Sequence, residues 1–121
     1  MITTEDKNKT LAPRLRAYQC EIAKQSRSIT YQALGKELGL LPPNTIHQLT
    51  VALEYLIEED AIATCPLIAA LVVSKAPNGL PALGFFDCAQ RVGRFDGDPA
   101  ELEGSAFHKA EFSKVVEFWH P

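Results

Sequence analysis

The chain has 121 residues, a length typical of one domain with one hydrophobic core. Hydrophobic residues make up 46% and charged residues 22%, which excludes collagen, a disordered chain, a disulfide scaffold and a membrane protein. The formal net charge of −3 argues against a protein whose whole surface attracts nucleic acid.

The charge is unevenly divided along the chain. Residues 1–40 carry seven basic and four acidic side chains, whereas residues 41–121 carry five basic and eleven acidic ones. These charges are either solvated on helix surfaces or gathered on one basic face that contacts phosphates. The candidates for such a phosphate-facing patch are Arg14, Arg16, Lys24, Arg27, Lys36 and Lys75.

Cysteine usage and the N-terminal residues suggest a compartment. Three widely spaced cysteines without a Cys-x-x-Cys pair are typical of reduced thiols. The polar N-terminus has no apolar stretch of the signal-peptide kind, and the longest apolar run, residues 66–73, is too short to span a bilayer. We therefore expect a cytoplasmic protein with no membrane partner, no metal and no cofactor.

Helical patterns fill the first half of the chain. We expect residues 1–10 to be flexible and residues 11–121 to form a single domain, beginning with a helix over about 13–25. A second helix follows through Leu38, with Thr30 as its N-cap and Gly39 as a left-handed C-terminal cap. Residues 29–60 are thus expected to form a helix–turn–helix.

The third helix has the clearest apolar stripe. Asn44 or Thr45 can cap it, and three acids close it at residues 58–60, which is unfavourable at a helix C-terminus unless a partner or water relieves the charge. The expected buried positions are Ile46, Leu49, Leu53, Leu56 and Ile57.

The second half predicts a hairpin and a helical tail. Apolar runs over residues 67–73 and 80–86, separated by a turn, suggest a β-hairpin over 66–86. Asp98 and Pro99 favour a short helix, and a last amphipathic helix over about 106–119 completes a tail spanning residues 97–120. The apolar side of this tail either closes the core, which we favour, or forms a homodimer surface.

This order of elements predicts an α+β winged-helix fold with additional N- and C-terminal helices, the third helix being the recognition helix and the hairpin the wing. Residues 29–86 also resemble the C-terminal domain of the DNA-alkylguanine alkyltransferases and their non-repairing alkyltransferase-like relatives. The resemblance rests on Ile29-Thr30-Tyr31-Gln32-Ala33-Leu34, on Leu38-Gly39 with Pro42, and on Leu67 to Ser74, which lies where the family has Ile-Pro-Cys-His-Arg-Val-Val-Ser.

The departures from the family pattern concern its chemistry. The family's nucleophilic cysteine, its histidine and its arginine fall on Ala69, Ala70 and Leu71. A methyl-accepting thiolate needs a thiol and a nearby base, so alkyl transfer is excluded. No arginine lies over residues 44–46, where the family inserts one into the space of a flipped base, and base flipping by that device is not expected.

Polar residues at the start of the third helix are the candidates for base contacts, because winged-helix proteins approach base edges there. They are Asn44, Thr45, His47 and Gln48; the alternative, which we favour for these residues taken alone, is capping or plain surface exposure. The resemblance implies a phosphate contact for Tyr31, whose alternative is packing on the third helix. Against DNA binding, the third helix carries no lysine or arginine.

Other reactive residues give weaker patterns. Cys65 has no neighbouring histidine, and Cys88 with His108 or His120 lacks metal-ligand spacing. The acids near Asp98 do not match a calcium loop. Arg91 and Arg94 either bind an anion or pair with acids just downstream, which we favour.

The sequence therefore favours a non-catalytic binding module that binds duplex DNA weakly. The alternative is a protein-interaction or assembly module that has kept the fold and lost DNA binding. A small ligand in a vestigial pocket near Ala69 is a further open question.

Overall fold

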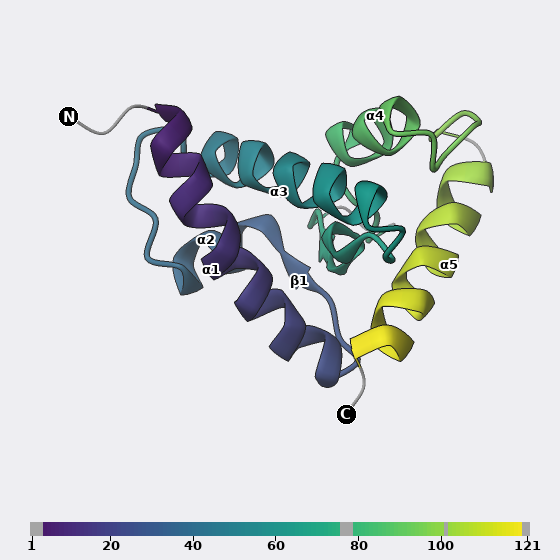
Figure 1. Cartoon of the computed structure of the whole chain (residues 1–121), viewed down its shortest axis with the longest axis horizontal. Coiled ribbons are helices and arrows are strands. Elements are labelled where there is room, and N and C mark those ends of the chain that lie inside the picture. The colour runs from purple at the N-terminus through teal and green to yellow at the C-terminus, as the bar shows by residue number, and fades with distance from the viewer. Residues whose placement is uncertain (1–3, 76–78, 101, 120–121) are drawn as a thin grey trace.

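The computed structural model describes residues 4–75, 79–100 and 102–119 of the chain. Over these residues the protein is mostly helical, with a small two-stranded parallel sheet, and its broad class is α+β (Figure 1). The elements in chain order are α1 (Thr4–Lys24), β1 (Ile29–Thr30), α2 (Tyr31–Glu37), α3 (Thr45–Ile62), the 3₁₀ helix η1 (Ile68–Leu71), β2 (Val72–Val73), α4 (Leu83–Arg91) and α5 (Leu102–Trp119).

The first helix is longer than predicted. It begins at Thr4, so residues 4–10 of the segment expected to be flexible are helical, whereas residues 1–3 lie outside the described part. Pro13, which suggested a helix start, lies inside α1. Proline is favoured in a first turn, and here the helix extends upstream of it. α1 crosses α3, and Leu15, Ile22 and Ala23 on its inner side are buried (Figure 1).

The two helices expected within residues 29–60 are present as α2 and α3, and both ends of α2 are formed as predicted. Thr30 Oγ1 accepts a hydrogen bond from Ala33 N at 3.2 Å, which caps the helix. At the other end, Gly39 has φ +70°, and the backbone N–H of Leu40 donates to Gly35 O at 3.0 Å. This pattern satisfies the last carbonyls of the helix and requires a residue tolerant of positive φ.

The helix α3 buries most of its predicted stripe, but not its first member. Leu49, Leu53, Leu56 and Ile57 are buried, whereas Ile46 is 44% exposed. Asn44 occupies the N-cap position with φ +66° and makes no side-chain capping bond. The first turn of α3 therefore projects from the core.

The predicted hairpin over residues 66–86 is wrong. Residues 68–71 form a 3₁₀ turn, the strand β2 pairs in parallel with β1, and residues 83–91 form the helix α4 instead of a returning strand. Phe85, Phe86, Cys88 and Ala89 are buried at helical spacing, and this amphipathic pattern continues past the point where a strand would end.

The tail is one helix, α5, rather than two. Asp98 Oδ1 accepts a bond from Ala100 N at 2.9 Å and forms a turn before the helix. Val115 is fully buried and Phe107 packs 4.9 Å from Phe95, ring centroid to centroid, so the apolar side of the tail closes the core as we favoured. Phe118 remains 52% exposed.

Candidate binding site

The first turn of α3 carries four of the predicted contact residues. Asn44 and His47 are exposed, while Thr45 is half-buried against α2. Gln48 has a different function, because its Nε2 donates to Pro43 O at 3.2 Å and holds the turn that precedes the helix. Only Asn44 and His47 are therefore fully presented to a partner.

Tyr31 and Lys75 lie at the same end of the small sheet. The parallel register pairs Ile29 with Val72 and Thr30 with Val73. The segments that follow β1 and β2 therefore leave the sheet side by side. The Tyr31 hydroxyl accepts a hydrogen bond from Ala82 N at 2.9 Å, and burial raises the pKa of this phenol. Lys75 is exposed.

The arginines of α1 do not join this face. Arg14 Nη2 donates to Leu38 O at 2.8 Å, at the C-terminal end of α2. Arg16 Nη1 donates to Asp60 Oδ1 at 2.8 Å, at the C-terminal end of α3. Two of the six residues of the expected basic patch therefore have their guanidinium groups engaged by partners within the protein.

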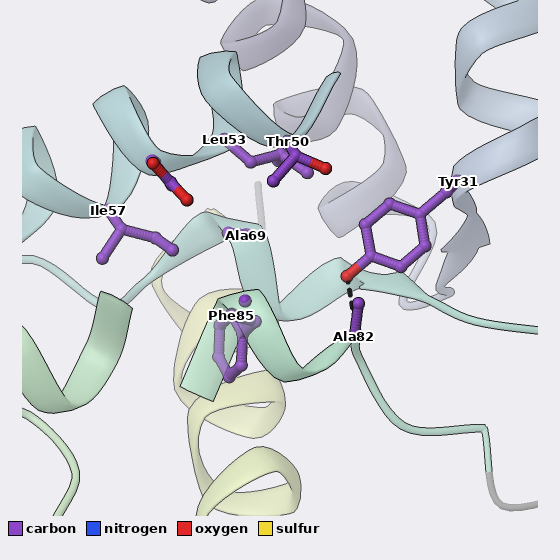
Figure 2. A pocket seen from close by; sticks show the side chains of 9 residues that line it. Tyr31, Thr50, Leu53, Ile57, Ala69, Ala82 and Phe85 are labelled. Carbon is purple, nitrogen blue, oxygen red and sulfur yellow. Dashed lines mark hydrogen bonds between the residues drawn. The ribbon is translucent and has the colours of Figure 1, made fainter. Parts of the chain in front are cut away.

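A pocket lies between α3 and α4, at the position of Ala69. Figure 2 shows Thr50, Leu53 and Ile57 on α3 and Phe85 on α4 around it, with Tyr31 at its side. Its volume is about 60 Å³, and its complete lining is Tyr31, Thr50, Leu53, Glu54, Ile57, Ala69, Ala82, Gly84 and Phe85. The sequence indicated a pocket near Ala69 but did not single out Glu54. The only indication in the sequence was that Glu54 lies four residues after Thr50, on the same face of the helix.

The segment that forms the pocket floor is positioned by polar side chains from three helices. Asp60 Oδ2 accepts from Ile68 N at 3.0 Å, and Glu111 Oε2 accepts from Leu67 N at 3.0 Å. Gln19 Nε2 donates to Ile68 O at 3.1 Å, and His108 Nε2 lies 2.9 Å from Ala70 O. Buried backbone N–H and C=O groups need hydrogen-bond partners. Here the four side chains supply the hydrogen bonds that neighbouring strands would supply in a sheet.

Two arginines contact the acidic end of α3 and the loop after it. Arg91 Nη1 lies 2.9 Å from Glu58 Oε1, and Arg94 Nη2 donates to Cys65 O at 2.8 Å and to Asp60 O at 3.3 Å. The expected pairing of Arg91 and Arg94 with acids just downstream is wrong, since both reach back to the end of α3 and the loop after it.

The described residues offer no metal centre and no activated thiol. All three cysteines are free, and burial raises the pKa of both Cys20 and Cys88. Cys65 is half-buried. No group of three His, Cys, Asp or Glu side chains in the described part could hold a metal ion, and His120 lies outside it.

Comparison with models of protein families, with curated proteins and with solved structures found no match for this chain. Within residues 4–75, 79–100 and 102–119, no helix is both long and apolar enough to cross a membrane.

Proposed function

We propose that this protein is a non-catalytic binding module of winged-helix type that contacts duplex DNA through the first turn of α3. The observation that carries the proposal is the exposed first turn of α3. α2 packs against α3, and Asn44 and His47 remain exposed to solvent. Their side chains can donate to or accept from base edges in a major groove.

Lys75, which is exposed just after β2, takes the place of a wing residue in this proposal. The preceding Ser74 is fixed by its N–H, which donates to Leu80 O at 2.9 Å. Tyr31, at the same end of the sheet, retains a hydroxyl proton for a phosphate oxygen while it accepts from Ala82. Few cations support this face, so we expect weak binding. Three free thiols suit a cytoplasmic setting.

Fluorescence anisotropy of a labelled duplex, titrated at low and moderate salt, tests the proposal. We expect saturable binding that weakens as salt rises, because phosphate contacts release counterions. Lys75→Glu should weaken binding to every sequence. Lys109→Glu, an equal charge change on α5, should leave it unchanged. Absence of binding at low salt would contradict the proposal.

Two exposed aliphatic side chains beside the same turn support a second candidate, a protein-interaction module. Leu41 is 76% exposed and Ile46 is 44% exposed. Exposed aliphatic side chains such as these can form the apolar core of a protein interface. Sedimentation analysis separates the two functions: self-association that Leu41→Ser abolishes, without DNA binding, would favour the interaction module.

A further inference from the structure

The pocket beside Ala69 has an apolar floor and one carboxylate without a partner. Leu53, Ile57 and Phe85 are buried side chains that line it. Glu54 lines it too and is half-buried, and no hydrogen bond or ion pair to another described residue engages its carboxylate. A half-buried carboxylate without a partner gains from a positively charged one.

The Thr50 hydroxyl of the pocket is also disposed to accept a hydrogen bond. Thr50 Oγ1 donates to Ile46 O at 2.9 Å, which leaves its lone pairs available. None of the nine lining residues is a lysine, arginine or histidine, so no positive charge in the lining attracts an anion. The nearest described guanidinium on α4, that of Arg91, is held by Glu58.

The Glu54 carboxylate acts electrostatically on the neighbouring Cys88. Burial raises the pKa of the Cys88 thiol on α4; Arg91 opposes the shift, and Glu54 and Glu58 add to it. Both carboxylates therefore act on the same end of the groove between α3 and α4. A phosphate or carboxylate ligand would be repelled here.

We propose that this pocket binds a small primary ammonium ion with a short alkyl body, its nitrogen on the Glu54 carboxylate and its hydrocarbon against Leu53, Ile57 and Ala69. The volume of about 60 Å³ suits such a ligand. A single water needs roughly 10–15 Å³ of such space, so the pocket admits several heavy atoms and excludes a large ring system. This proposal goes beyond DNA binding, because it is argued from the Glu54 carboxylate and the apolar lining.

The probe is n-butylammonium, titrated into the ¹⁵N-labelled protein and followed by amide chemical shifts. We expect saturable shifts at Thr50, Ala69 and Gly84. Two ligands of the same shape serve as controls: n-butanol should bind more weakly, and butyrate should not bind. Absence of saturable shifts with n-butylammonium in the millimolar range would overturn the proposal, as would equal binding of n-butanol or any saturable binding of butyrate at these amides.

Two variants separate charge from shape. Glu54→Gln should weaken n-butylammonium binding about tenfold or more and leave n-butanol unaffected, because only the ammonium ion uses the charge. Glu37→Gln, an equal charge change on α2, should have no effect. Gly84→Ala places a methyl group 3.9 Å from Thr50 Cγ2, so it should narrow the pocket and weaken both ligands in a folded protein. If both Glu54→Gln and Gly84→Ala retained the wild-type affinity for n-butylammonium, the proposed binding site would be wrong.

Discussion

Arg16 on α1 and Asp60 on α3 form an ion pair of 2.8 Å between residues 44 positions apart in sequence. The Asp60 side chain is 4% exposed and that of Arg16 is 27% exposed. Burial raises the pKa of Asp60, while the Ile68 N–H and Arg16 act in the opposite direction. Arg16 also lies 3.4 Å from Glu59, and Arg91 pairs with Glu58, so each of the three acids at the end of α3 has a cationic partner.

Removing Arg16 should be costly, because it leaves a buried carboxylate with one backbone partner. For Arg16→Leu we expect a loss of about 2–3 kcal/mol in the free energy of unfolding, below the ~3–5 kcal/mol for fully buried pairs because Arg16 is partly solvated. Urea denaturation measures this. Lys24→Met, which breaks the exposed Glu21 pair, should cost less than about 0.5 kcal/mol. Equal losses would contradict our interpretation.

His108 should make stability depend on pH. Burial lowers the pKa of this imidazole, which lies against Ala70 O and the ring of Phe112. Below the unfolded-state pKa of about 6.5, the unfolded chain binds a proton that the folded protein resists, so His108 destabilises the fold as pH falls through that range.

The measurement is the free energy of unfolding on both sides of this range. His108→Gln should flatten the loss seen in the wild-type protein. His47→Gln changes an exposed imidazole and should preserve it. An unchanged pH profile in His108→Gln would argue that another group is responsible.

Glu111 should stabilise the fold through one oxygen. Its Oε2 accepts from Leu67 N, and the residue is 4% exposed. Glu111→Ala should cost about 1–3 kcal/mol because it leaves a buried N–H unsatisfied. Glu111→Gln keeps an acceptor and should cost less. Thermal unfolding compares them, with exposed Glu117→Ala on the same helix as a control expected to be near neutral.

Two glycines should respond oppositely to alanine. A Cβ at Gly104 would collide with the carbonyl of Pro99, so Gly104→Ala should destabilise the protein despite alanine's higher helix propensity. At Gly84 the nearest atom is 3.9 Å away, and alanine should be neutral or stabilise by up to ~1 kcal/mol. Chemical denaturation decides, and a stabilised Gly104→Ala would show that the Pro99 turn yields freely.

Local signals in the sequence predicted local structure well. Thr30 and Gly39 mark the ends of α2 through short-range bonds and backbone conformation, both readable within a few residues. The hairpin failed for a related reason: the run ending at Phe86 looks like a strand, and only Cys88 and Ala89 beyond it reveal the helical period.

The site depends on contacts that spacing cannot show. Arg14 and Arg16 were plausible phosphate ligands, yet their partners are at Leu38 and Asp60, far along the chain. From the sequence, Glu54 looks like any polar residue of an amphipathic helix. It lines a pocket because α4 packs next to α3, and the sequence did not predict α4. The DNA contacts of Asn44 and His47 remain predictions.

The side-chain hydrogen bonds to the backbone of residues 67–70 have a consequence for how this protein unfolds. Gln19, Asp60 and Glu111 bring α1, α3 and α5 to the same few peptide groups. Detaching any one of these helices would strand donors or acceptors in an apolar interior. Partly open forms are thereby penalised, and amide protons throughout the three helices should exchange with solvent through one common global opening.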